Sequence, residues 1–509
     1  MLRFKHTVSL LLALHLTTAG HAAVPEDSSA VREWTLEEII DRACTCSPDA
    51  LSARHTFRAA YWDWRAYKAN YLPALTLTSS PNLNRAINEV TMGDGSVRFV
   101  EQNLLTSDLT LQLTQRVAWT GGTISLESSL QRLDLFSDGS ASWKSIPANI
   151  SYSQSLFGYN SMKWERRTEP LRYEEAQKSY LETMELVAAQ AVDYFFALAN
   201  AQSNYETACQ NYANADTLYH FARGRYEIGT ITENEMLQLE INRLNEETNR
   251  LDALTEMEEA TLTLCSYLGF PEGEGPQKVR IGTELPELTV DPGHALLWAH
   301  AQSPDIVSLK RQQIEAESYV AQAKANAGFK ADLYLRFGLT QTSDGPLGEA
   351  YHHLLDQQIV SVGFTLPILD WGRGRGQVRV AQSQRDLVNT QVAQHYTDFD
   401  QNIRKIVGQF NLQSRRVFVA GRTDSTAQRR SDVARRLYLL GRSSVLDLNA
   451  SISEKDEARR NFINALHTYW SLYYTLRSLT LYDFQNGRPL RADYEALREY
   501  NDESPGGKP

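Results

Sequence analysis

A short motif written twice constrains the fold of this chain more than any other feature of its sequence. Residues 222–229 follow the pattern Ala-Arg-x-x-Tyr-x-x-Gly, and residues 434–441 follow it again. A carboxylate stands six residues after each glycine, as Glu235 in the first copy and as Asp447 in the second. A duplicated motif of this kind indicates an internal repeat, and a repeat decides how every other feature of the fold is interpreted.

A second pair of segments supports the same division of the chain. The pattern Ala-x-x-x-Ser-Pro-Asp occurs at 43–49 and again at 299–305, and the triplet Lys-Ala-Asn follows at 68–70 and at 324–326. Because both pairs of repeated segments occur in the same order, we predict two halves with the same arrangement of helices and strands. Each Tyr-x-x-Gly glycine lies where one helical pattern ends and another begins, which is a position that favours glycine in a left-handed cap.

The N-terminus has the three regions of a secretory signal peptide. Arg3 and Lys5 precede an apolar run, and small residues follow it up to Ala23. No later stretch approaches the ~20 apolar residues of a membrane-spanning helix. The predicted organisation is a signal peptide at 1–22, a first repeat at 23–271, a joint at 272–292, a second repeat at 293–482, and a polar, disordered tail at 483–509.

Composition excludes some classes of function. The formal charge is -11, which disfavours a nucleic-acid partner because phosphate binding requires a basic face. Of the four cysteines, Cys44 and Cys46 are two residues apart on one predicted helix, so we expect small buried side chains rather than disulfides. No serine, cysteine or histidine stands in a motif for nucleophilic catalysis, so we expect no enzyme and no cofactor.

Two further motifs suggest binding sites only weakly. The glycines of 372–376 lack the spacing and the βαβ context of a phosphate-binding loop, and they are interpreted as a joint between a strand and a helix. His352 and His353 with Asp356 could hold a metal ion, although adjacent histidines in a polar loop are more often simply exposed. We therefore predict no metal site.

Periodicity predicts long helices. Apolar residues recur in steps of three and four from Leu181 to Tyr226, which is the seam of a coiled coil, and a second helix follows from about Glu233 to Leu268. The second half repeats the plan, with one helix ending at Leu440 and another running from Val445 to Tyr482. Each half is expected to hold one helix of ~55–65 residues, or ~80–100 Å, beside shorter helices stacked end to end. Such a bundle is a rod.

Other segments alternate with a period of two, which predicts strands that have one apolar and one small polar face. In the first half they lie between 75 and 156, and in the second half around 333–339 and 359–366. The glycine pair 121–122 between two such runs indicates a hairpin. The first half is longer by 44 residues between corresponding landmarks, because Asn70 to Gly229 spans 159 residues and Asn326 to Gly441 spans 115. We place the extra residues in an additional hairpin.

One such strand alone would suit a half-buried soluble sheet. Several of them in an exported chain, with aromatic residues near their ends, fit a transmembrane barrel with an aromatic girdle. Four to six strands are fewer than the eight of the smallest single-chain barrels, so closure requires several chains. The aromatic residues in question are Tyr71, Trp119, Trp143, Tyr159, Trp164, Tyr351 and Trp371.

The duplicated order of helix, strands, helix, Tyr-x-x-Gly tip and returning helix resembles TolC-like outer-membrane efflux proteins across essentially the whole mature chain. Three short runs are similar to sequence motifs of that family: Leu-Pro-x-Leu at 72–75, Leu-Gln-Leu-Thr-Gln at 111–115 and Leu-Asp-x-Gly-Arg at 369–373. The resemblance implies a mainly α fold with a β-barrel part. It further implies a homotrimer with a shared twelve-strand barrel in the outer membrane of a Gram-negative bacterium and an α-helical tunnel through the periplasm.

The same resemblance implies a function and partners. The chain would be the passive exit duct of a tripartite efflux or type I secretion system, embedded in outer-membrane lipid. A periplasmic adaptor (membrane fusion) protein would join it to an inner-membrane transporter. The alternative from another class is an exported coiled-coil protein with a structural or interaction role and no pore.

The resemblance also implies site residues at the two tips, which would form the periplasmic entrance. Adaptor contacts would be Tyr226, Gly229, Thr230, Gly441 and Arg442, and the pore constriction would involve Asp447, Glu235, Arg442 and Tyr438. Threefold symmetry would turn Asp447 into a ring of three negative charges that attracts cations. The family's second aspartate is Ala450 here, and Ser443 replaces its basic latch residue. Otherwise Asp447 is a helix-start carboxylate favoured by the helix dipole.

Overall fold

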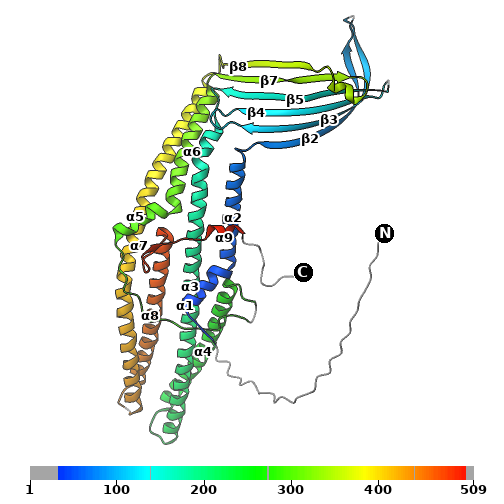
Figure 1. Ribbon diagram of the computed structural model, residues 1–509. Helices are drawn as coiled ribbons and strands as arrows, with labels where there is room; N and C mark the ends of the chain where they lie inside the picture. Colours follow the sequence, from blue (N-terminus) through cyan, green and yellow to red (C-terminus); the bar gives the residue numbers. More distant parts are fainter. Residues whose placement is uncertain (1–31, 94, 138, 272–273, 441, 500–509) are drawn as a thin grey trace, which may run out of the picture.

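The computed structural model describes residues 32–93, 95–137, 139–271, 274–440 and 442–499. The predicted signal peptide at 1–22 and Gly441 lie outside these residues. Figure 1 shows a rod of helices that carries a β-sheet at one end and two helical hairpins at the other. Within the part of the chain that is described, no helix is both long enough and apolar enough to cross a membrane.

The first two helices each begin at a side-chain cap. α1 (Leu36–Cys46) begins with a capping box, in which the Glu38 N–H donates to Thr35 Oγ1 at 3.4 Å and the Thr35 N–H donates to Glu38 Oε2 at 2.9 Å. The helix ends at Ser47, whose hydroxyl oxygen accepts from the Ala50 N–H at 3.1 Å and starts α2 (Pro48–Ala69). The chain thus breaks into two helices at Ser47 and Pro48.

The second half has the same break, although its sequence predicts one helix from His294 to Ala327. α5 (Pro292–Gln302) ends at Ser303, and α6 (Pro304–Ala327) begins there. Ser303 Oγ accepts from the Asp305 N–H at 3.2 Å. The prediction of a continuous helix is wrong because proline at the first helical position cannot donate to the preceding turn, whereas it suits a new helix start.

Two helices run the length of the rod. α3 (Ser161–Glu227) and α7 (Arg373–Leu439) have 67 residues each, which corresponds to ~100 Å. α3 begins eleven residues before the predicted start at Arg172, because Asn160 Oδ1 accepts from the Lys163 N–H at 3.2 Å and caps a polar first turn. The returning helices are α4 (Glu233–Tyr267) and α8 (Val445–Thr480).

The helices lie four abreast in both parts of the rod. Near the sheet the order is α2, α3, α6 and α7, and near the tips it is α4, α3, α8 and α7. One edge of this layer is therefore formed by α2 and α4, and the other edge by α7 along its whole length. The core that joins the helices includes the fully buried aromatic side chains Phe195, Phe196, Phe410 and Tyr469.

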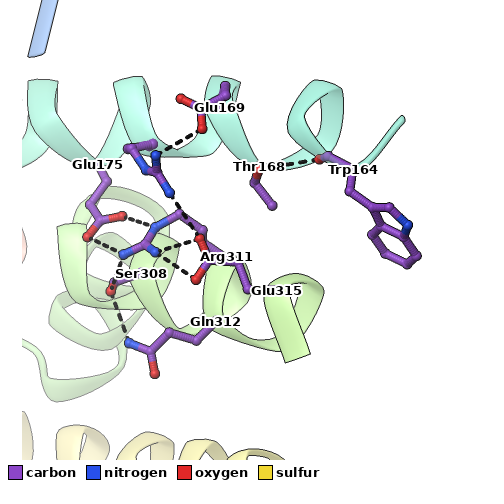
Figure 2. A network of polar contacts seen from close by, with 9 residues as sticks. Trp164, Thr168, Glu169, Glu175, Ser308, Arg311, Gln312 and Glu315 are labelled. Atoms are coloured by element: carbon purple, nitrogen blue, oxygen red, sulfur yellow. Dashed lines mark hydrogen bonds and ion pairs between the residues drawn. The ribbon is translucent and has the colours of Figure 1, made fainter. Parts of the chain in front are cut away.

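Ion pairs connect the two halves where α3 meets the second repeat. Figure 2 shows Arg311 of α6 between Glu175 of α3 and Glu315 of its own helix. Arg311 Nε lies 2.7 Å from Glu175 Oε2, and its Nη1 lies 3.0 Å from Glu315 Oε1. The bond to Glu175 raises the pKa of Arg311. Further along the rod, Arg477 Nη2 of α8 donates to Glu185 Oε1 of α3 at 2.8 Å.

Six long strands form one antiparallel sheet in the order β2, β3, β4, β5, β7, β8. The hairpin predicted at Gly121 and Gly122 joins β3 to β4, with Gly121 at a φ of +79°. Two short strands, β1 (Glu33–Trp34) and β6 (Lys278–Val279), pair separately. The long strands are β2 (Ala74–Thr91), β3 (Val97–Arg116), β4 (Thr123–Leu135), β5 (Ser140–Leu156), β7 (Lys330–Ser343) and β8 (Leu355–Thr365).

One face of the sheet carries an exposed apolar belt that crosses all six strands. Its cross-strand neighbours are Leu77 and Leu111, Leu113 and Leu126, Leu126 and Ile150, Ile150 and Phe337, and Leu335 and Val360. The other face pairs Thr78 with Thr110, Gln112 with Glu127, and Ser125 with Ser151. The predicted division into an apolar and a small polar face is confirmed.

The number of strands differs from the number that the resemblance implies. A twelve-strand barrel made by three chains needs four strands per chain, whereas the described residues form four long strands in the first half and two in the second. The additional hairpin lies within the sheet. The additional hairpin expected in the first half thus supplies the two further strands, and whether they enter a barrel is a separate question.

The C-terminal segment is a second correction. Residues 483–499 were expected to be disordered because they are polar, but they form parts of a small strand pair, β9 (Tyr482–Asp483) and β10 (Arg488–Pro489), and the helix α9 (Tyr494–Glu499). The Tyr494 ring lies 5.4 Å from the Phe57 ring, and its hydroxyl donates to the Gln177 carbonyl at 3.2 Å. One aromatic anchor thus fixes a polar segment. Residues 500–509 lie outside the described part of the chain.

Candidate channel entrance at the hairpin tips

The first tip is closed by backbone bonds around Gly229. α3 ends at Glu227, and Gly229 has a φ of +74°, the left-handed conformation predicted for it. The Thr230 N–H and the Thr230 hydroxyl both donate to the Arg225 carbonyl at 2.9 Å. Thr230 therefore ties off the last turn of α3.

Glu235 completes a capping box at the start of α4. The Glu235 N–H donates to Thr232 Oγ1 at 3.3 Å, and the Thr232 N–H donates to Glu235 Oε2 at 3.1 Å. A carboxylate in the first turn of a helix is also stabilised by the helix dipole. Capping of α4 alone therefore explains why a glutamate stands at position 235.

The second tip is built in the same way. The Arg442 N–H donates to the Leu437 carbonyl at 2.9 Å and closes the end of α7. Ser444 caps α8, because its Oγ accepts from the Asp447 N–H at 3.1 Å. The Ser444 hydroxyl also donates to Asp447 Oδ2 at 2.8 Å. Glu235 and Asp447 therefore occupy corresponding positions at the starts of α4 and α8, each three residues after the N-cap residue.

The two motif tyrosines have different surroundings. Tyr438 is half-buried in a small apolar cluster that joins the two hairpins, whereas the exposed fraction of Tyr226 is 39%. Burial raises the pKa of Tyr438, and its hydroxyl feels the opposing charges of Arg225 and Glu235 from the first tip. The cluster consists of Leu218, Ala222, Ile231, Leu239, Ala434, Tyr438, Leu448 and Ile452.

The structure brings some of the predicted site residues together and leaves others apart. Tyr438 lies beside the first tip near Glu235. Arg442 and Asp447 are exposed, and the contacts of Asp447 within the described chain are with Ser444 of its own helix start. A ring of Asp447 carboxylates needs further copies of the chain.

Sequence reasoning missed a charge difference between the two edges of the rod. α4, at one edge, carries nine aspartates or glutamates and two arginines. The last 35 residues of α7, at the other edge, carry eight lysines or arginines and two aspartates. All eight cations are exposed. Counting charges for each predicted helix would have found this signal.

The weaker motifs have structural explanations. Asp370 carboxylate oxygens accept from the Gly372 and Gly374 N–H groups at 2.9 and 2.8 Å, so the glycine-rich segment is the joint that starts α7. The carbonyls of His352 and His353 accept from the Gln341 amide at 3.2 and 2.8 Å. The four cysteines are free and partly buried.

A family profile described as "Outer membrane efflux protein" matches residues 39–270. This segment belongs to the outer membrane efflux protein family. The predicted resemblance and the outer-membrane location are thereby confirmed. No protein of curated function matches the chain in sequence.

Solved structures extend the likeness of this chain to its second half. The outer membrane channel CmeC of Campylobacter jejuni is 16% identical, with a TM-score of 0.65, over 91% of this chain and 89% of the channel. The outer-membrane channel OprN is 16% identical, with a TM-score of 0.63, over 88% of this chain and 90% of OprN. VceC of Vibrio cholerae is 16% identical, with a TM-score of 0.60, over 87% of this chain and 96% of VceC. The chain therefore has the fold of these outer-membrane channels.

Proposed function

We propose that this efflux protein is the passive outer-membrane exit duct of a tripartite efflux or type I secretion system. Three copies would close their sheets into one barrel and their helices into one tunnel. The apolar belt across all six strands carries this proposal, because a belt opposite a polar face suits a wall between lipid and water. In a coiled-coil rod without a pore, such a belt would be exposed to water, which is unfavourable.

The charges at the rod edges support self-association in a ring. The acidic edge helix α4 of one chain would meet the basic edge helix α7 of the next, which is a head-to-tail contact that closes by rotation. Both helices also expose apolar side chains, among them Ile241 and Leu244 on α4 and Phe418 and Val433 on α7. Contact between the edges would cover these groups and pair the opposite charges.

The tips are the proposed place of partner contact and selectivity. Tyr226, Gly229 and Thr230 of the first tip, with Gly441 and Arg442 of the second, would engage a periplasmic adaptor that leads to an inner-membrane transporter. In a trimer, three exposed Asp447 carboxylates would face a narrow water-filled mouth and favour cations. Glu235 and Tyr438 would support this mouth from the first tip and from the joint between the hairpins.

The test is purification of the mature protein from outer membranes in mild detergent, followed by light scattering, electron microscopy and conductance in planar bilayers. We expect a trimeric tapered particle about 140 Å long, from ~100 Å helices plus a membrane barrel, and single-channel currents. A monomer that stays in solution without detergent and gives no current would refute the duct and favour the rod without a pore.

A further inference from the structure

The register of the sheet identifies which strands are additional in the first half. β2 starts four residues after Asn70, and β7 starts four residues after Asn326, so these two strands correspond. β5 and β8 correspond as well, because each leads into a long helix. The strands without a counterpart are β3 and β4, which are joined by the turn at 117–122.

This inserted hairpin lies inside the sheet. β3 pairs with β2 from Ala74 to Thr91, and β4 pairs with β5 from Thr123 to Leu135, with a register shift at one point. β2 and β5 would be neighbours without the insertion. An ion pair also ties β4 to the second repeat across β5, since Arg336 Nη2 of β7 lies 3.0 Å from Glu127 Oε2.

The inserted strands carry the same membrane features as the others. Leu111 on β3 and Leu126 on β4 continue the apolar belt, and Gln112 and Ser129 continue the polar face. The turn between β3 and β4 presents Trp119 with an exposed fraction of 86%, and Trp371 after β8 has an exposed fraction of 89%. Both tryptophans lie where strands meet the helical rod, at the level expected for an interfacial aromatic girdle.

We propose that all six strands of each chain enter the shared wall, so that the trimer forms an eighteen-strand barrel in place of a twelve-strand one. The inference rests on the proposed function. At equal strand tilt the diameter grows roughly in proportion to strand number, so the barrel is about 1.5 times as wide. The rod keeps four helices abreast per chain, so the extra width belongs to the membrane segment alone.

A wide barrel changes where the duct selects its cargo. Barrels of 16–18 strands enclose an aqueous channel. The membrane segment of this protein is then a broad water-filled exit lined by the polar face, including the Glu127–Arg336 pair. Size selection falls to the helical part and the tips.

The test places single cysteines, labelled with an environment-sensitive fluorophore, in the full chain after the four native cysteines are replaced by alanine. The sites are Leu111 and Leu126 in the inserted strands and Val360 in β8 as the reference, with Gln112 and Ser129 as polar-face controls. The protein is reconstituted in vesicles that contain spin-labelled lipids. We expect strong quenching at Leu111, Leu126 and Val360, which all lie on the apolar face, and several-fold weaker quenching at the two controls.

The outcomes separate this inference from the proposed function. Quenching at Val360 without quenching at Leu111 and Leu126 would put the hairpin outside the wall and overturn the eighteen-strand barrel while the duct stands. Absence of quenching at Val360 as well would overturn both. Electron cryo-microscopy of the trimer gives the count directly, and twelve strands in the wall would overturn the inference.

A deletion variant provides a matched comparison. Asn84 of β2 and Ser140 at the start of β5 lie at one level of the sheet, through Leu104 and Leu135, so removal of residues 87–138 leaves a short turn between β2 and β5. We expect this variant to form a twelve-strand barrel about two thirds as wide. An unchanged barrel width would contradict the proposal, and the labelling of the full chain decides the question if the deletion variant does not assemble.

Discussion

The two halves of the molecule share one plan but use it differently at their tips. The motif tyrosine of the second half, Tyr438, is half-buried between the hairpins, whereas that of the first half, Tyr226, is exposed. The helix starts beyond the two tips are nearly alike, with Glu235 and Asp447 in corresponding positions. The duplicated motif therefore forms the same local turn at both tips, but the packing around it differs. Tyr438 packs between the two hairpins, whereas Tyr226 is exposed to solvent.

The edges of the rod differ in charge, and reversing that difference should have the largest effect. We expect Arg416→Glu with Arg429→Glu on α7 to raise trimer dissociation in detergent about tenfold or more. Exposed pairs contribute ~0.2–1 kcal/mol each, and every loss is repeated at three interfaces. Light scattering across a dilution series measures the effect. Lys310→Glu with Lys324→Glu on α6, away from both edges, is the control of equal charge change.

The complementary change should restore assembly. Glu240→Lys with Glu256→Lys on α4, added to the reversed α7, places opposite charges on the two edges again. If the combined variant dissociates no less than the α7 variant alone, the contact between α4 and α7 is not the one that closes the ring.

Tyr438→Ala and Tyr226→Ala compare the two tips directly. Removal of a half-buried ring should cost about 1–2 kcal/mol, so Tyr438→Ala should speed amide exchange about 5–30-fold in both hairpin tips. Tyr226→Ala should leave exchange nearly unchanged. Hydrogen-exchange mass spectrometry measures both variants, and equal acceleration in the two would contradict the difference in packing.

A structural feature could be predicted from the sequence where neighbouring residues determine it, and could not where contacts between distant segments determine it. The turn at Gly121 and Gly122 and the left-handed end of α3 at Gly229 follow from neighbouring residues, and the sequence predicts both, whereas it misses the helix break at Ser303 and the early start of α3. The different burial of Tyr226 and Tyr438 arises between hairpins about two hundred residues apart, and one motif gives no sign of it. The order around Tyr494 likewise depends on Phe57, which lies far away along the chain.

The junction of the halves should respond to pH at Glu182. Burial first, and the charge of Asp305 second, raise the pKa of this α3 carboxyl to about 7. Because the folded state binds the proton more tightly than the unfolded chain does, the stability contributed by the protonated form is present below the ordinary carboxyl pKa. It is lost as pH rises to about 7. The protection factors of the α3 and α6 amides, which correct exchange rates for their intrinsic pH dependence, should therefore fall between pH 5 and 7.5, approximately the interval spanned by these pKa values. Glu182→Gln should flatten that trend, whereas an unchanged trend would assign it to other groups.

The smallest expected effect distinguishes the two tip carboxylates. If Asp447 lines the mouth, Asp447→Asn should lower the cation-to-anion permeability ratio about twofold, measured as a shift of the reversal potential in a salt gradient. Glu235→Gln is the matched comparison, because Glu235 holds the corresponding helix-start position at the first tip, and it should shift the ratio less if Asp447 alone lines the mouth. Equal shifts would assign selectivity to both tips, and no shift in either variant would leave the carboxylates as helix caps alone.

The helices of the rod also differ in continuity, and this has a mechanical consequence. α3 and α7 run unbroken from the tips to the sheet, whereas α1–α2 and α5–α6 are divided at Ser47 and Ser303. In each chain two continuous helices thus lie beside two pairs of helices that are broken at a serine. We expect a rotation of the tips to be transmitted along α3 and α7 to the sheet ~100 Å away, whereas the broken helices can move relative to each other at Ser47 and Ser303.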